Sequence, residues 1–446
     1  MTGPVALHWF RRDLRLDDNP ALRAALASGL PVACAFCLDP RLFKAPDVAP
    51  ARLRILLEGL EDLHARLAAR GGALVVRVGV SQKEIAGVVR QLGAREVHAC
   101  ADDEPFALRR DADAARLIAE AGAELVLHDD LTVVPHRLIA LTGGGSPRTY
   151  SAYARCVERA IGDPAALPAE LALEGRLLPA SEPFTLPGES ALGVSSAQRF
   201  PLRGGETGAL ERLRSWRDER AGRYAARRDD VWDPDATSLL SPAFKLGMLS
   251  PRRAAAVAAR AGTAKWRSEL LWRDWFKYVL SQHSDLAEHA VNRRFDELAW
   301  PGTDEHFEAW TRGETGFGIV DAGMRQLAET GFLPNRVRMI AASLLVKHLH
   351  VDWRRGEQWF RAHLADGDLS SNAGGWQWVA GLGLDAAPYF RVFNPLLQER
   401  KFDPDGAYVR CWAPDRPAPI VDLAVERERA LELYGSVAKG SDPERA

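Results

Sequence analysis

The sequence predicts a parallel-sheet α/β domain, a long linker and an all-α domain, in that order. Over the first 130 residues, short apolar runs alternate with helical patterns, an order typical of a parallel sheet with helices on both faces. After about residue 206, helical patterns dominate and strand patterns vanish. We therefore expect a Rossmann-like α/β domain over residues 1–130, a linker over 131–205 and a helical domain over 206–446.

Five strands are predicted in the first domain, at residues 5–10, 32–38, 73–78, 96–101 and 124–127. Helical patterns lie between them, for example at 50–69 and 82–92. The turn after the first strand contains no GxGxxG, so the dinucleotide-binding fingerprint is absent. Residues 131–205 are richer in Pro, Gly and Ser and only weakly periodic, which predicts a connection across the surface.

The composition is that of an ordinary globular protein, with 47% apolar and 26% charged residues among 446. The formal net charge of -2 gives no global basic signature, so any contact with nucleic acid must come from a local patch. The sequence has no apolar run of about 18 residues and enters a strand pattern at once, without a signal peptide. We expect a cytoplasmic monomer without a membrane span.

The CxxC formed by Cys34 and Cys37 lies inside an apolar run that predicts a strand. Residues i and i+3 of a strand point to opposite faces, which disfavours chelation or a redox turn. No second pair of cysteines exists to complete a zinc site. We expect both to be buried core cysteines and predict no metal site.

The most informative segment is residues 366–378, which holds two carboxylates, an amide, three glycines and two tryptophans. Glycines weaken helices and carboxylates resist burial, so a simple core helix would not use these residues. A site for a flat heterocycle with polar edges would use them, and the glycines would let the backbone approach its ring. In a helix, Trp376 and Trp378 would lie about 200° apart and face different neighbours. The alternative is two core tryptophans in a helix bundle.

Residues 237–242 place small hydroxyl side chains before a helix that is expected to open near Ser250. Such residues can form a cradle for a pyrophosphate, and the alternative is plain N-capping.

Two further segments carry candidate residues at helical spacing. Glu269, Trp272 and Phe276 share one face, which suits a base edge and a stacking surface; the alternative is an amphipathic core helix with surface charges. Asn335 and Met339 also share a face, and the alternative there is a helix start with solvated arginines.

Two of these segments, residues 335–339 and 366–378, belong to a set of motifs by which the chain resembles the photolyase/cryptochrome family. The motifs are residues 9–19, 315–327, 335–339, 366–378 and 385–395. The resemblance covers nearly the whole chain, and its details are most similar to class I cyclobutane pyrimidine dimer photolyases. It implies an antenna-chromophore domain followed by a helical domain that binds FAD and DNA.

The resemblance implies that FAD binds in a U shape within the helical domain. Asn372 matches the residue that faces flavin N5, where an amide can accept the N5–H. Arg338 is expected to pair with Asp366. The matched FAD-binding positions are Tyr224, Thr237, Ser238, Leu239, Leu240, Ser241, Trp266, Arg273, Arg338, Asp366, Gly367, Asp368 and Asn372.

The resemblance also implies an electron relay and a lesion pocket beside the flavin. Trp376, Trp353 and Trp300 match the relay, from the flavin outward. Glu269, Asn372 and Met339 match positions that take part in catalysis. The positions matched to the lesion and its DNA are Arg228, Glu269, Trp272, Asn335, Arg336, Met339 and Trp378.

Three positions depart from the family pattern. Leu239 stands where the family often has Arg, Pro334 where many members have His, and Ala373 where some have a second Asn. The first departure bears on one phosphate contact, and none of them alters the family resemblance.

A second, antenna chromophore is implied for the first domain. Cys37, Arg52, Asp102, Glu104 and Lys245 resemble positions of members that bind an 8-hydroxy-5-deazaflavin. Glu104 also resembles an acid that contacts a methenyltetrahydrofolate in other members. The alternatives to the deazaflavin are this folate, FMN, and an empty site with ordinary surface charges.

The implied function is that of a deoxyribodipyrimidine photo-lyase, which repairs cyclobutane pyrimidine dimers in UV-damaged DNA by electron transfer from excited reduced FAD. One alternative is a cryptochrome, a photoreceptor without repair activity, and Glu269, Met339 and Trp378 together favour repair. A (6-4) photolyase is disfavoured, because its chemistry is associated with histidines where Asn335 and Met339 stand. A plain flavin oxidoreductase is a more distant alternative, since no nicotinamide site is visible.

Overall fold

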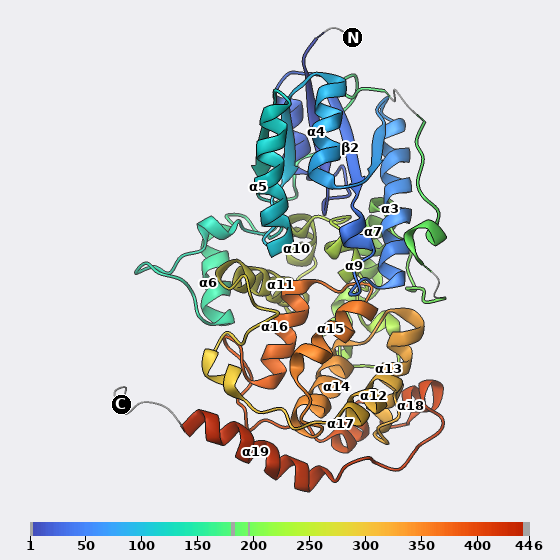
Figure 1. The fold of residues 1–446 in the computed structure, drawn as a ribbon, viewed down its shortest axis with the longest axis vertical. Helices are drawn as coiled ribbons and strands as arrows, with labels where there is room; N and C mark the ends of the chain where they lie inside the picture. The colour runs from blue at the N-terminus through green and yellow to red at the C-terminus, as the bar shows by residue number, and fades with distance from the viewer. Residues whose placement is uncertain (1–2, 180–182, 195–196, 440–446) are drawn as a thin grey trace.

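The computed structural model describes residues 3–179, 183–194 and 197–439, and its two domains lie at opposite ends of the long axis (Figure 1). The first domain holds a five-stranded sheet in the order β3-β2-β1-β4-β5, with every neighbouring pair parallel. The predicted fold class is therefore confirmed. The strands are β1 (Val5–Phe10), β2 (Val32–Leu38), β3 (Leu74–Val78), β4 (Ala94–Cys100) and β5 (Glu124–His128).

The helices of this domain cover both faces of the sheet, as the alternation of strands and helices requires. Successive residues of β1 enter different hydrophobic clusters, Ala6 on one face and Leu7 on the other. The same alternation separates Cys34 from Cys37, and both are buried free thiols, as predicted. The helices are α1 (Pro20–Ala27), α2 (Pro40–Phe43), α3 (Pro50–Ala68), α4 (Ser81–Leu92) and α5 (Pro105–Glu120).

The segment predicted as a linker connects the domains and carries a helix that its weak periodicity did not reveal. This helix, α6 (Tyr150–Ala160), starts at an N-cap in which Thr149 accepts the Ala152 N–H at 3.3 Å. It packs against α11 (Ala264–Gln282). Farther along the linker, Leu177 forms a parallel bridge with Val32 at the start of β2. The connection is thus packed against both domains.

The second domain is helical (Figure 1). One hydrophobic cluster runs from the sheet domain through α3 into α7, α10 and α11. A second cluster fills the space among α12 to α18. Within the described residues, no helix is both long and apolar enough to cross a membrane. Besides α11, the helices are α7 (Glu206–Glu219), α8 (Tyr224–Arg227), α9 (Ser241–Lys245), α10 (Pro251–Arg260), α12 (Asp304–Arg312), α13 (Gly318–Thr330), α14 (Asn335–Lys347), α15 (Trp353–His363), α16 (Leu369–Ala380), α17 (Pro395–Phe402), α18 (Ala407–Trp412) and α19 (Leu423–Lys439).

Candidate functional site

A cavity of about 610 Å³ lies among α9, α11, α14 and α16 of the helical domain. Its volume is within the range of cofactor and small-molecule sites. It brings together every position that was matched to FAD and every position matched to the lesion and its DNA. These are Tyr224, Arg228, Thr237, Ser238, Leu239, Leu240, Ser241, Trp266, Glu269, Trp272, Arg273, Asn335, Arg336, Arg338, Met339, Asp366, Gly367, Asp368, Asn372 and Trp378.

Helix α16 carries most of the segment 366–378 and forms one wall of the cavity. Asp368 caps the helix by accepting the Ser371 N–H at 3.2 Å and the Ser370 hydroxyl at 2.5 Å. Trp376 is buried in the core, whereas Trp378 is half-buried at the cavity wall. The rings have different contacts, which confirms that the two tryptophans face different neighbours.

The three glycines of this segment have different structural roles. The expectation that all of them let a ring approach the backbone is therefore wrong for two of them. A Cβ at Gly374 would collide with the Phe276 ring, so this glycine permits α11 and α16 to pack closely. A Cβ at Gly367 would collide with the Arg52 guanidinium. A Cβ at Gly375 would meet no atom within 4 Å, and Gly375 lines the cavity. Only Gly375 therefore fits the predicted role.

Asn372 is oriented by the buried carboxylate of Glu357 on α15. Its Nδ2 donates to the Glu357 backbone oxygen at 2.8 Å and to Oε1 at 2.9 Å. Because both amide hydrogens have partners, Oδ1 is the atom left to accept a hydrogen bond from the cavity. Burial raises the pKa of Glu357 to about 6, and the nearby Arg361 and Asn372 oppose that rise.

The loop before α9 lines the opposite end of the cavity and is held from behind by α7. Arg212 donates to the backbone oxygens of Ser238 at 2.9 Å and Thr237 at 3.1 Å. Leu239 has a φ of 55°, a left-handed conformation that is strained for a residue with a Cβ. The helix expected near Ser250 is α10, and the Ser250 hydroxyl caps it by accepting the Arg253 N–H.

The aromatic wall on α11 is supported by the linker. Trp272 stacks on Tyr150 of α6, with ring centroids 3.9 Å apart and an interplanar angle of 6°. The Tyr150 hydroxyl donates to the Ser268 backbone oxygen at 3.0 Å. Trp272 is thus fixed on one face, and its half-buried position leaves it at the cavity wall.

Charged side chains near this wall form pairs across the cavity mouth. Arg228 is ion-paired with Glu269, and Lys265 Nζ lies 3.0 Å from the same carboxylate. Arg336 is held by Asp229 at 2.9 Å and lies over the Phe402 ring. The side chains matched to DNA contacts therefore have carboxylate partners in this structure.

Two other predicted contacts are confirmed. Asn335 Nδ2 lies 3.7 Å from Met339 Sδ, so the two side chains share a face of α14. Arg338 Nη2 lies 3.1 Å from both carboxylate oxygens of Asp366.

Asp368 joins the cavity to the domain boundary. Its carboxylate lies 2.5 Å from Arg12 Nη2, 3.1 Å from Lys277 Nζ and 3.6 Å from Lys245 Nζ. Burial alone would raise the pKa of Asp368, but these three cations hold it well below its ordinary value. Burial lowers the pKa of Lys277 to about 8, so its ammonium group is protonated at neutral pH.

Of the five residues matched to the antenna, Lys245 alone lines the larger cavity. Arg12 binds Asp102 at 3.2 Å and Glu104 at 2.5 Å, and Lys245 Nζ binds Glu104 at 3.0 Å, so three of the five belong to the network around Asp368. Arg52 Nη2 donates to the backbone oxygens of Arg361 at 2.5 Å and Leu364 at 2.8 Å. Cys37 Sγ donates to the Gly79 backbone oxygen at 3.5 Å.

The three tryptophans matched to the relay lie in or against one hydrophobic cluster. Trp376 and Trp353 are buried members of this cluster. Trp300 packs against the cluster, and its ring centroid lies 6.3 Å from that of Tyr434. The centroid of the Trp376 ring lies 5.0 Å from that of Phe360 and 6.1 Å from that of Trp310. Trp376 also lines the cavity, whereas Trp353 and Trp300 lie outside its lining.

Sequence reasoning missed several side chains of the site. Lys265 precedes Glu269 by four residues, a helical spacing that could have indicated their ion pair. Arg12 and Arg391 lie inside the motifs 9–19 and 385–395, but the sequence did not predict a site role for either residue. Nothing local signals the others, because their contacts are long-range: they are Tyr150, Arg212 and Lys277.

The chain is similar to known proteins over nearly its whole length. The family described as DNA photolyase matches residues 6–171, and the FAD binding domain of DNA photolyase matches residues 266–416. A deoxyribodipyrimidine photo-lyase of Thermus thermophilus is 41% identical over 447 residues, covering 98% of this chain and 100% of that protein. A class III photolyase structure from Agrobacterium tumefaciens has a TM-score of 0.87 and 34% identity, covering 98% of both chains. A Synechocystis cryptochrome structure has a TM-score of 0.88 and 27% identity, covering 97% of this chain and 99% of the other.

Proposed function

The chain belongs to the photolyase/cryptochrome family, and we propose from that premise that it is a deoxyribodipyrimidine photo-lyase. The reaction is the light-dependent repair of cyclobutane pyrimidine dimers in UV-damaged DNA. The observation that carries the proposal is one cavity lined both by the positions matched to FAD and by those matched to the lesion. Electron transfer from cofactor to lesion requires this adjacency.

The residues of the cavity fit an FAD. The open backbone at Gly375 suits the approach of a flat ring, and Asn372 Oδ1 can accept a hydrogen bond from its edge. Thr237, Ser238 and Ser241 supply hydroxyl groups at the other end of the cavity. FAD bound in its reduced form would supply, on excitation by light, the electron that opens the dimer. Leu239 offers no charge to a phosphate, so the contact made by an arginine elsewhere in the family is absent here.

The part of the cavity lined by Glu269, Trp272 and Trp378 fits a pyrimidine dimer that has left the DNA helix. Flipping a damaged base costs a few kcal/mol, and stacking on an aromatic ring contributes about 1–3 kcal/mol per base. Trp272 and Trp378 can therefore offset the cost of flipping. Glu269 can accept hydrogen bonds from a base edge, and Asn335 and Met339 complete the pocket. DNA phosphates would compete with Glu269 for Arg228 and with Asp229 for Arg336, which makes binding sensitive to salt.

The tryptophans Trp376, Trp353 and Trp300 are proposed to carry electrons to the flavin from the surface. Trp310 offers a matched control, because it is buried and contacts the Trp376 ring but was not matched to the relay. We expect Trp353→Phe to slow light-driven reduction of the bound, oxidised FAD at least tenfold, and Trp310→Phe to leave the rate unchanged. Transient absorption measures both rates, and the reverse order would contradict this assignment.

The principal alternative is a cryptochrome-type photoreceptor without repair, and one assay separates the two. The reduced protein is incubated with dimer-containing oligonucleotide under blue light, and recovery of thymine absorbance is followed. We expect recovery in the light and none in the dark. Absence of recovery in the light would contradict the repair proposal. Asn335 and Met339 stand where a (6-4) photolyase is associated with histidines, so an oligonucleotide carrying a (6-4) lesion should stay unrepaired.

The antenna chromophore, the class within the family and the cytoplasmic location stay predictions. The structure places Asp102, Glu104 and Lys245 in an ion network, and the deazaflavin rests on the sequence resemblance alone. The absorption spectrum of chromophores released by denaturation distinguishes a deazaflavin from a folate, from FMN and from FAD alone.

A further inference from the structure

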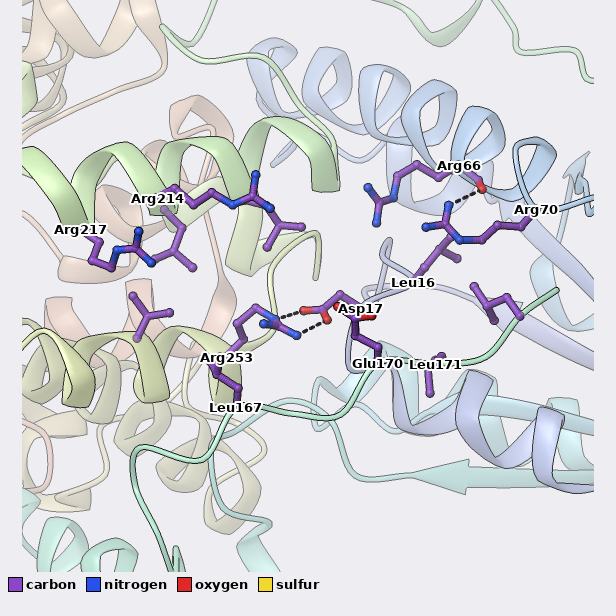
Figure 2. Close-up of a pocket in the computed structure, with 14 residues that line it drawn as sticks. Leu16, Asp17, Arg66, Arg70, Leu167, Glu170, Leu171, Arg214, Arg217 and Arg253 are labelled. Atoms are coloured by element: carbon purple, nitrogen blue, oxygen red, sulfur yellow. Dashed lines mark hydrogen bonds and ion pairs between the residues drawn. The ribbon is translucent and has the colours of Figure 1, made fainter.

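A second cavity, of about 360 Å³, lies where the two domains and the linker meet. Its walls come from the loop after β1, the end of α3, linker residues 167–173, α7 and α10 (Figure 2). It shares no lining residue with the larger cavity and contains none of the positions matched to the antenna. Its volume is within the range of small-molecule sites.

Arginine side chains from three helices line this cavity (Figure 2). Arg66 comes from α3 and Arg70 from the turn just after it, Arg214 and Arg217 come from α7, and Arg253 comes from α10. The opposing carboxylates of the lining are Asp17 and Glu170. The rest of the lining is aliphatic, with Leu16, Leu173 and Leu213 buried beneath the charges. The cavity therefore combines excess positive charge with an apolar floor.

The arginines differ in how far the protein neutralises them. Asp17 is bound by Arg253, as Figure 2 shows, and Arg66 lies 2.9 Å from the buried Glu206. Arg217 binds the neighbouring Asp218 at 2.6 Å.

Arg70 and Arg214 have no carboxylate partner within the described residues. Arg70 Nη1 donates to the Arg66 backbone oxygen at 3.0 Å, and no side-chain contact of Arg214 within hydrogen-bond distance is found in the described part of the chain. Two guanidinium groups, one just after α3 and one on α7, are thus free to bind an anion.

We propose that this cavity binds a small organic phosphate, with its dianionic phosphate between Arg70 and Arg214 and its apolar body against the leucines. One guanidinium group can donate two parallel hydrogen bonds to phosphate oxygens. Two guanidinium groups also match the two negative charges of a phosphate monoester. The side chains of Arg66 and Arg253 are only 23% and 17% exposed, whereas Arg214 is exposed, so the cavity is reached from solvent at Arg214. The site is independent of the proposed repair function.

The test uses the protein loaded with FAD, so that the larger cavity is filled, and 1-naphthyl phosphate as the probe. We expect saturable binding at one site per chain, measured by quenching of naphthyl fluorescence, and at least tenfold weaker binding of 1-naphthol. Arg70→Gln and Arg214→Gln should each weaken binding of the phosphate at least tenfold. Arg223→Gln, an exposed arginine just after α7 and outside the cavity, is the matched control and should bind normally.

Three outcomes would overturn the proposal. They are absence of saturable binding at millimolar probe, equal binding by wild type and both variants, and displacement of the probe by dimer-containing DNA, which would place it in the larger cavity. Melting temperatures of the variants confirm that they fold. Arg214→Lys keeps the charge but loses the paired hydrogen bonds, so it should bind between wild type and Arg214→Gln. Failure of repair activity would leave these outcomes unaffected.

Discussion

The two cavities differ in how the protein treats their positive charges. In the larger cavity, Arg338 pairs with Asp366, and Arg12, Lys245 and Lys277 converge on Asp368. In the smaller one, neither Arg70 nor Arg214 is paired with a carboxylate of the described residues. A site whose cations are already neutralised suits a ligand recognised mainly by stacking and hydrogen bonds. A site with unpaired cations suits a ligand that brings its own negative charge.

The largest effect is expected from removing the Asp368 carboxylate, which lines the larger cavity and neutralises three cations. Asp368→Asn leaves Arg12, Lys245 and Lys277 facing only Asp102 and Glu104. Breaking a buried ion pair on one side costs about 3–5 kcal/mol, because a charge is left uncompensated.

Denaturation of the FAD-free protein by urea measures this loss of unfolding free energy. Asp218→Asn, which breaks an exposed pair beside the smaller cavity, is the control and should leave stability unchanged. If the two variants were equally stable, the contrast between the cavities would be contradicted.

Trp378→Ala tests whether the larger cavity recognises its ligand by stacking. We expect affinity for dimer-containing oligonucleotide to fall by about 1–3 kcal/mol, the contribution of one base stacked on an aromatic ring. Trp232→Ala is the control, because Trp232 is 51% exposed and lies outside the cavity lining. Fluorescence anisotropy measures both affinities, and an equal loss in the two variants would place the lesion elsewhere.

Glu357, which orients Asn372, is a buried carboxylate. Burial raises its pKa by more than the nearby Arg361 and Asn372 lower it. Its pKa is raised to about 6, so between about pH 4.5 and 6 the folded protein binds more protons than the unfolded chain. The contribution of Glu357 to stability is therefore full at low pH and is lost as pH rises through about 6. We expect a loss of about 2 kcal/mol, from 1.36 kcal/mol per pKa unit. Glu357→Gln should remove this slope in unfolding free energy between pH 4 and 7, and an unchanged slope would contradict the assignment.

The smallest effect on stability is expected at Gly375. A Cβ there would enter open space beside the cavity, whereas a Cβ at Gly374 would meet a packed side chain. Gly375→Ala should stabilise the FAD-free protein by about 0.5–1 kcal/mol, because Ala favours a helix and no atom opposes its Cβ. The same substitution should weaken FAD binding, measured by flavin fluorescence. Gly374→Ala is the contrasting neighbour, and it should lose stability through its collision with Phe276. Unchanged FAD affinity in Gly375→Ala would contradict close approach of the ring.

The sequence by itself determined the order of elements and most of the larger cavity's lining. Alternating apolar runs specify a parallel sheet because only buried strands separated by helices satisfy that pattern. Strand geometry alone separated Cys34 from Cys37, and helical spacing alone placed Asn335 beside Met339. The lining residues lie in dense local motifs, so their resemblance could be read without knowing how the chain folds.

Only the tertiary structure decided which residues from distant elements meet. It placed Arg12 against Asp368, Tyr150 against Trp272 and Phe276 against Gly374. It also assembled the arginine-lined cavity from three helices and the linker, none of which carries a motif for it. The physical reason is that periodicity reports which face of an element is buried, whereas the packing of whole elements selects the partner on that face. Local pattern therefore identified the larger site, and global packing created the smaller one.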